Sequence, residues 1–340
     1  MAPYYIHITK LLNWNIDQSI INSLQIKNTD YLNQLNEKYD DAIANLGETE
    51  QNDLLALKAN YYAKIGDKEN AITAYNLAIK KTGPLGHRID LYFSLIRVGF
   101  FFLDNDLIQN NIDLVHELIE KGGDWDRRNR LKVYKGIYLI SKRQFKEATD
   151  MLLDTLATFT STELMDYKDF VRYCVLTAAL TLNRPDFKLK VLDSPEILEC
   201  IHQIPHLSDY ANAFYHCKYQ QFFVALAQVE KSLKLDVYLS QHYRYYIREM
   251  RIRVYSQLLE SYRSVTITSL ASSFGVTQDW IDNDLATFIA AGRLNAVIDK
   301  VNGIVETNRP DAKNAQYQAS IKEGDSLLNS IQKLSRVINV

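Results

Sequence analysis

Five side chains of the kinds that bind metals lie close together in one segment of the chain. They are Cys200, His202, His206, His216 and Cys217. A zinc site would need the spacing of a CxxC pair or of an HExxH helix, and neither spacing occurs in this segment. Pro205 also interrupts any single helical face that could present several of these ligands. We therefore expect no metal site and no cofactor, and we interpret the five as half-buried helix residues.

Motifs for catalysis are missing as well. The sequence contains no GxxxxGK phosphate loop, no GxSxG nucleophile elbow and no GxGxxG nucleotide-binding turn. It also lacks a His-x-His pair with a downstream Asp, which would indicate a zinc isopeptidase, and its carboxylates are scattered over predicted helix surfaces. An enzyme would need a pocket with convergent polar groups, and nothing in the sequence argues for an active site, so we expect that the protein is not an enzyme.

Two groups of basic residues could bind an anionic partner. The first comprises Arg127, Arg128, Arg130, Lys132 and Lys135, and the second comprises Arg244, Arg248 and Arg251. Each group could be a solvated helix face or a charged surface for a neighbouring protein. For the first group we favour the solvated face, and for the second group both interpretations stay open.

Residues 264–307 predict two short helices around a turn, followed by a β-hairpin, which is the outline of a winged helix. We expect Thr268 and Thr277 to cap the two helices, Gly275 to permit the turn and Gly292 to end the second helix. The dipeptide Asn302-Gly303 predicts a hairpin between segments 294–299 and 304–307, and the segment 308–311 should end the wing.

The second helix of this winged module is unsuited to DNA. It carries Asp279, Asp282 and Asp284 and has no Lys or Arg between positions 278 and 291, so it would repel a phosphate backbone. We expect the module to bind protein instead. Its candidate interface residues are Phe274, Trp280, Ile281, Val297, Ile304 and Val305. Trp280 could equally be a core residue, since a large aromatic side chain suits both places.

These candidates must be positioned by a mainly helical chain. Among 340 residues, 47% are hydrophobic, whereas only 12 are Gly and 6 are Pro, which disfavours a loop-rich or all-β fold. The 39 basic and 41 acidic residues give a net charge of −2, which does not favour a polyanion-binding protein. Three cysteines form no disulfide framework and suit a reducing compartment. No apolar run of about 18 residues predicts a membrane span.

Three segments repeat a helix–break–helix pattern. They are residues 60–79, 99–119 and 136–156. The segments align when Ala63, Phe102 and Ile140 are matched, which gives steps of 39 and 38 residues. The same alignment groups Ala71, Asn110 and Ala148. A period of about 40 residues with one helix pair per unit is typical of a solenoid like that of tetratricopeptide repeats.

A last helix is predicted over residues 314–337. Its apolar stripe comprises Ile321, Gly324, Leu328, Ile331, Leu334 and Ile338. A terminal helix with such a narrow stripe often binds a partner helix. We therefore add Ile321, Leu328, Ile331 and Leu334 to the candidate interface residues.

A helical-repeat array followed by a winged helix and a terminal helix resembles the PCI family, found in the proteasome lid, the signalosome and an initiation factor. Several blocks resemble a proteasome lid subunit in particular. They are 120–164, VLDSPEIL (191–198), REMRIRVYSQLLESY (248–262) and VIDKVNGIVETNRPDAKNAQY (297–317). The resemblance runs over about residues 56–340. Residues 1–50 match poorly, and family members generally carry more N-terminal sequence, so we expect a short version of the family's chain.

The resemblance implies a mainly α protein with four parts. These are N-terminal helices (1–50), a solenoid like that of tetratricopeptide repeats (51–163), a PCI domain (164–311) ending in the winged helix, and a partner-seeking helix (312–340). It further implies a non-catalytic structural subunit of the proteasome lid, acting in lid assembly and ubiquitin-dependent degradation in the cytoplasm and nucleus. The implied partners are other PCI subunits, the small acidic lid subunit, the lid deubiquitinase pair and the ATPase ring.

Two alternatives stay open. The first is the homologous PCI subunit of the signalosome, which co-purification with deneddylation activity would favour. The second is a nucleic-acid-binding PCI adaptor, which would need a basic face on the winged module.

Overall fold

The computed structural model describes residues 1–308 and 312–338 of the chain. Its residues group into two compact units, Met1–Thr177 and Ala178–Val340, which we describe in turn. The predicted mainly helical fold is confirmed. None of the helices in the described ranges combines the length and the apolar character that crossing a membrane requires. The segment 309–311, where we expected the wing to end, lies outside the described residues.

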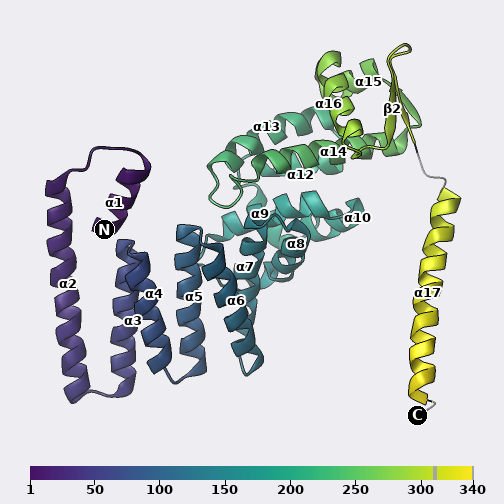
Figure 1. The fold of residues 1–340 in the computed structure, drawn as a ribbon. Helices are drawn as coiled ribbons and strands as arrows, with labels where there is room; N and C mark the ends of the chain where they lie inside the picture. The colour runs from purple at the N-terminus through teal and green to yellow at the C-terminus, as the bar shows by residue number, and fades with distance from the viewer. Residues whose placement is uncertain (309–311, 339–340) are drawn as a thin grey trace. The chain divides into compact units, whose positions relative to one another are not determined.

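The first unit is a row of antiparallel helices (Figure 1). They are α1 (Ala2–Leu11), α2 (Gln18–Asn45), α3 (Glu48–Ile65), α4 (Lys68–Lys81), α5 (Leu85–Phe102), α6 (Asn105–Glu120), α7 (Trp125–Ser141) and α8 (Phe145–Asp154), then a short 3-10 helix (Leu156–Thr158) and the start of α9 (Tyr167–Thr181). Helix α3 packs on α4, α5 on α6 and α7 on α8. These pairs confirm the three helix–break–helix segments predicted from the sequence.

Two of the three breaks are set by capping residues. Gly66 takes a left-handed φ of 79° that ends α3, and the carboxylate of Asp67 accepts the N–H of Asn70 at 3.2 Å to begin α4. Asp104 begins α6 in the same way, accepting a main-chain N–H of that helix at 3.1 Å. The third break has no such cap, because the side chain of Gln144 makes no capping hydrogen bond to α8.

Where the two helices of a pair pack closely, a small residue lies at the contact. Which of the two helices supplies it differs between the pairs. Ala71 and Ala148 are fully buried, but Asn110 is exposed. Counted from the capping residue, the equivalent of Ala71 in α6 is Ile108. Here α5 supplies the small residue, since a β-carbon on Gly99 would lie 2.7 Å from Cγ1 of Ile108. Grouping Asn110 with the two alanines was therefore wrong.

The second unit continues from the end of α9 through shorter helices. They are α10 (Arg184–Phe187), a π-helical turn (Lys188–Leu192), α11 (Pro195–Ile201), α12 (Leu207–Tyr215), α13 (Tyr219–Leu235) and α14 (Tyr243–Ser261). In its core the hydroxyls of Tyr210 and Tyr246 lie 2.7 Å apart, and both side chains are buried. Arg253 of α14 donates to the carbonyls of Leu180 and Leu182, where the negative end of α9 favours a cation.

The winged module follows α14. It consists of β1 (Ser264–Thr266), α15 (Ile267–Phe274), α16 (Gln278–Ala290), β2 (Ala296–Asp299) and β3 (Ile304–Thr307) (Figure 1). The strands are antiparallel in the order β1-β3-β2, with Val265 and Ile298 opposite Val305. The predicted hairpin is confirmed, and its Gly303 has a φ of 64°. Strand β1 was not predicted. The terminal helix α17 (Ala312–Ile338) agrees with the predicted span within two residues at its start and one at its end.

Candidate protein-docking site

Capping residues fix the helices of the winged module. Thr266 accepts a main-chain N–H of α15 at 3.3 Å and begins that helix. The predicted cap, Thr268, was wrong, because this residue lies inside α15. Gly275 has a φ of 67° in the turn, as its position predicted. Thr277 precedes α16 as expected, although its side chain makes no capping hydrogen bond.

Three of the candidate interface residues lie in the core of this module. Phe274, Ile281 and Val305 are at most 1% exposed. The ring of Phe274 lies 4.9 Å from that of Phe223 on α13 and 5.0 Å from that of Tyr255 on α14. These side chains hold the module against the two preceding helices. They are core residues of the module, and the prediction that they form an interface stays untested.

The exposed candidates in the module are Trp280 and the hairpin. Trp280 is 40% exposed, Val297 is exposed and Ile304 is half-buried. The covered part of Trp280 lies against Phe223, with ring centroids 6.1 Å apart, and against the guanidinium of Arg251 at 5.7 Å. Trp280 therefore combines the two interpretations of the sequence, since one side is packed and the other is open to a partner.

The stripe on α17 is open to solvent. Its four candidate residues, Ile321, Leu328, Ile331 and Leu334, are each between 54% and 64% exposed. At about 100° per helical residue they fall within about 140° of the circumference, so they share one face. Every side chain that the structure describes on α17 is exposed, so no described residue of the chain covers this face. The side chain of Ile338, the last residue of the predicted stripe, lies outside the description.

Further exposed apolar residues escaped the sequence reasoning. Tyr317 and Leu327 lie within the same arc of α17 as the stripe, and Val301 is 94% exposed at the hairpin turn. A helical-wheel count over the whole of residues 314–337 would have found the first two, because they share the arc of the four candidates. Val301 lies in a turn, where no regular spacing of apolar residues could have predicted its exposure.

Two of the three acidic residues on α16 are engaged within the chain. Asp284 accepts the guanidinium of Arg251 and the hydroxyl of Tyr255, each at 2.9 Å, and both donors belong to α14. Burial raises the pKa of Asp284, while the positive charge of Arg251 acts in the opposite direction. Asp282 pairs with Lys300 at 3.1 Å. The face of α16 that carries Asp284 thus packs on α14 and is not free to enter a DNA groove.

The first basic group is paired within its own unit. Arg127 and Arg130 both contact the carboxylate of Asp90 on α5, at 2.8 and 3.3 Å. Lys132 forms an ion pair with Asp154 on α8. The structure therefore favours the interpretation of this group as an internally paired, solvated helix face.

The second basic group divides. Arg251 belongs to the pair with Asp284, whereas Arg244 and Arg248 are exposed on α14. Arg244 donates to the hydroxyl of Tyr243 at 3.0 Å, and neither exposed arginine lies in the winged module. Of the three arginines that could form a charged surface for a neighbouring protein, only Arg244 and Arg248 are exposed.

The five residues of metal-binding type are dispersed over helix ends and turns. Cys200 is buried in α11, and His206 has a left-handed φ of 62° just before α12. His216 and Cys217 form the turn after that helix. Within the described ranges, no three His, Cys, Asp or Glu side chains are grouped so that they could hold a metal ion.

Three family profiles match successive parts of the chain. The profile described as 26S proteasome subunit RPN7 matches residues 17–190. The PCI domain profile matches 226–309, and a profile described as the C-terminal helix of 26S proteasome regulatory subunit RPN7/PSMD6 matches 316–338. The PCI match covers most of α13, all of α14 and the winged module, and the last match lies within α17, so the two matches include the elements that carry the exposed candidates.

Individual relatives are similar over the whole chain. A Dictyostelium discoideum protein named 26S proteasome non-ATPase regulatory subunit 6 is 47% identical over 340 residues, which is 100% of this chain and 89% of the relative. An Arabidopsis thaliana homolog of that subunit is 48% identical over 340 residues, covering 100% of this chain and 88% of its own. The Saccharomyces cerevisiae 26S proteasome regulatory subunit RPN7 is 40% identical over 369 residues, covering 100% and 85%. The chain belongs to the RPN7 family of proteasome subunits.

The match to the RPN7 family begins closer to the N-terminus than the resemblance that we inferred from the sequence. The family profile begins at residue 17, whereas the resemblance inferred from the sequence began near residue 56. The expectation that residues 1–50 match poorly is therefore corrected for residues 17–50. The PCI profile of 226–309 falls inside the range 164–311 that we expect for this domain, and the assignment of 164–225 to it remains a prediction.

Proposed function

We propose that this RPN7 family member is a non-catalytic structural subunit of the lid of the 26S proteasome regulatory particle, acting in lid assembly and thereby in ubiquitin-dependent degradation. The observation that carries the proposal is the exposed stripe on α17, which matches the family's C-terminal helix profile. An isolated chain gains nothing from a helix with a solvated apolar face, whereas a subunit can bury that face against helices of its neighbours. The names of the relatives, regulatory and non-ATPase subunits, agree with a role outside catalysis.

The winged module is the second proposed docking surface. Trp280 and the hairpin residue Val297 are exposed apolar side chains of this module, Ile304 is half-buried, and Trp280 packs on one side against Phe223. Tryptophan is enriched among the residues that dominate protein–protein affinity. We propose other PCI subunits of the lid as the partners of this surface and of α17. The small acidic lid subunit, the deubiquitinase pair and the ATPase ring are proposed as further neighbours, in the cytoplasm and nucleus.

The two alternatives are less well supported. Relatives at 40–48% identity are named as 26S proteasome subunits, which favours the proteasome over the signalosome. A nucleic-acid adaptor would need a basic winged face, but the acidic residues of α16 lie there and one of them binds α14.

Deletion of residues 314–340 tests the proposal. The shortened chain should stay folded and monomeric by gel filtration and thermal unfolding, because the described side chains of α17 contribute nothing to the core. When expressed with a tag in its own cells, it should fail to enter the complex. Melting of the whole chain would show that α17 is part of the core, and normal incorporation would show that α17 is not a docking helix.

A further inference from the structure

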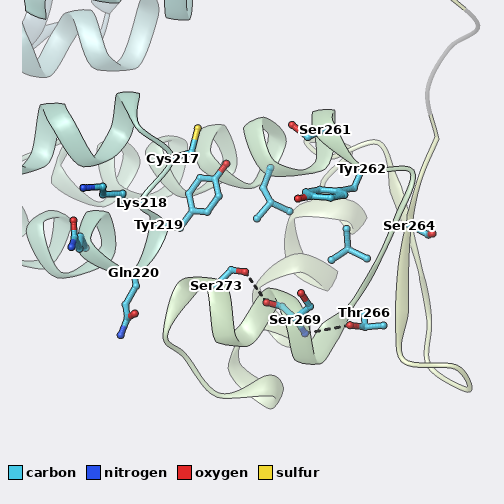
Figure 2. Close-up of a pocket in the computed structure, with 13 residues that line it drawn as sticks. Cys217, Lys218, Tyr219, Gln220, Ser261, Tyr262, Ser264, Thr266, Ser269 and Ser273 are labelled. Carbon is cyan, nitrogen blue, oxygen red and sulfur yellow. Dashed lines mark hydrogen bonds between the residues drawn. The ribbon is translucent and has the colours of Figure 1, made fainter.

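A groove rich in hydrogen-bond donors lies apart from the candidate interface residues. It has a volume of about 790 Å³ and forms where the start of α13, the end of α14, β1 and α15 meet (Figure 2). None of the ten candidate interface residues lines it. All of its walls belong to the second unit, so its shape is set by helices that pack directly on the winged module.

The wall of the groove is rich in hydrogen-bond donors and lacks acidic groups. Of its 13 lining residues, seven carry a hydroxyl group, two carry a side-chain amide and one, Lys218, carries an ammonium group, whereas none carries a carboxylate. Hydroxyl, amide and ammonium groups all donate hydrogen bonds, and no fixed negative charge in the wall repels an anion. The chemistry of the groove therefore suits a negatively charged ligand.

Several of these donors are unused within the chain. Figure 2 shows the groups that are occupied, since the hydroxyl of Ser273 donates to the carbonyl of Ser269 and Thr266 caps α15. The side-chain hydroxyls of Ser261, Tyr262 and Ser264 make no hydrogen bond to any described residue. They line the groove from the end of α14 across to β1, and each can donate to a ligand without breaking an existing bond.

Positive charge is concentrated at the other end of the groove. Lys218 is exposed just before α13, whose first turn contains no acidic residue, so the positive end of the helix dipole adds to its charge. Arg184 lies nearby and donates to the carbonyl of Tyr215 at 2.8 Å. Burial raises the pKa of Tyr219 in the groove wall, and the positive charge of Arg184 acts in the opposite direction.

One wall is the outer edge of a β-strand. In the order β1-β3-β2, one edge of β1 has no neighbouring strand among the described residues. Thr307 donates to the carbonyl of Arg263 at 2.9 Å and Ile267 to that of Gly303 at 2.8 Å. Because main-chain groups alternate in direction along an antiparallel strand, those of Ser264 face away from β3. This edge can hold a ligand in an extended conformation.

We propose that the groove binds an anionic side chain, a carboxylate or a phosphorylated hydroxyl, carried by an extended protein segment. Lys218 supplies the opposite charge at one end of the groove, and the hydroxyls of Ser261 and Ser264, toward the other end, donate to main-chain carbonyls of the same extended segment. This site goes beyond the proposed function, because it contains none of the residues through which α17 and the winged hairpin would dock, and peptides alone can test it.

Synthetic peptides and the purified full chain provide the test. The probes are an eight-residue peptide of alternating Ser and Glu, its Ser and Gln counterpart, and a version with one phosphoserine. Isothermal titration should show binding of the Glu peptide and at least about tenfold weaker binding of the Gln peptide, because a hydrogen bond to a charged group is worth about ten- to a hundredfold in affinity. Tighter binding of the phosphoserine peptide would assign the site to phosphorylated segments, and equal binding would assign it to carboxylates.

Two charge reversals distinguish the effect of a charge in the groove on peptide binding from the effect of the overall charge of the protein. Lys218→Glu should weaken binding of the Glu peptide by about tenfold or more, because it places a like charge in the wall. Lys231→Glu makes the same change in net charge on the exposed surface of α13 outside the groove, and it should alter binding less than about twofold. Equal effects of the two substitutions, equal binding of the Glu and Gln peptides, or no binding at millimolar peptide would each overturn the proposal.

Discussion

Replacing the four stripe residues of α17 with alanine should remove the chain from its assembly without unfolding it. The variant carries Ile321→Ala, Leu328→Ala, Ile331→Ala and Leu334→Ala. These side chains contact no described core, so the melting temperature of the free chain should not change. Alanine is also the best helix former, so α17 keeps its helical preference and loses only its apolar face.

The expected loss of affinity follows from the exposed area. Full burial of a Leu or Ile side chain is worth about 1.5–3 kcal/mol. Because each of the four residues is 54–64% exposed in the free chain, docking should contribute about 1–2 kcal/mol per residue and about 4–7 kcal/mol in total. A factor of ten in affinity corresponds to about 1.4 kcal/mol, so the Kd should rise about a thousandfold or more.

The assay is titration of the purified chain into lid particles assembled without this subunit, followed by native mass spectrometry, with thermal unfolding of the free chain measured in parallel. The matched control is Lys322→Ala with Lys333→Ala, which truncates two long side chains on the opposite face of the same helix. An unchanged Kd for the stripe variant would refute the reasoning. So would a control variant as weak as the stripe variant, or a large fall in the melting temperature of the free chain.

Three further predictions concern the fold that presents these surfaces. Asp284→Asn should lower the free energy of unfolding in urea by about 1–3 kcal/mol, because it leaves the partner guanidinium without its anion, and an unchanged value would contradict this role. Gly99→Ala should lower the free energy of unfolding by about 1–3 kcal/mol, because the new β-carbon would lie 2.7 Å from a side chain of α6. The control Gly324→Ala meets no atom within 4 Å, so it should leave the melting temperature of the chain equal or higher. The hydrogen bond from Lys68 lowers the pKa of Asp104, so the stability that its ionised form adds is present above pH 3.8 and is lost as the pH falls through the lowered pKa. Asp104→Asn should therefore differ from the parent at neutral pH and converge with it in acid, and a constant difference across that range would rule the assignment out.

Local patterns in the sequence predicted the elements of this fold well. The left-handed glycines at positions 66, 275 and 303 lie where breaks or turns were expected, and the hairpin follows the Asn-Gly dipeptide. These features depend on the conformational preferences of neighbouring residues, so they can be recognised without knowledge of the tertiary structure. Strand β1 escaped because three residues are too few to show alternation, and because its pairing partner lies about 40 residues away.

Side-chain positions that depend on tertiary contacts were harder to predict. Phe274 and Trp280 are both large aromatics on short helices, yet one is buried and the other is half-exposed. Hydrophobicity alone does not separate them, because a core and a protein interface favour the same residue types. The pairing of Arg251 with Asp284 likewise joins residues 33 positions apart and changes an apparent surface charge into part of the interior.

The relative placement of the stripe residues on α17 could be predicted from the sequence alone, whereas their contact with a partner stays a prediction. A single helix fixes the relative positions of its own side chains, so the spacing of Ile321, Leu328 and Ile331 could place them on one face without any other element. What the spacing left open was whether the rest of the chain covers that face. The exposure of all the described side chains on α17 answers this question for the free chain.

Gentle affinity purification of the tagged chain from its own cells, read by mass spectrometry, tests the central claim most directly. We predict recovery of lid, ATPase and core-particle subunits of the proteasome in constant proportion to the tagged chain. Recovery of signalosome subunits in their place, or of nucleic-acid-binding factors without proteasome subunits, would contradict the proposed role.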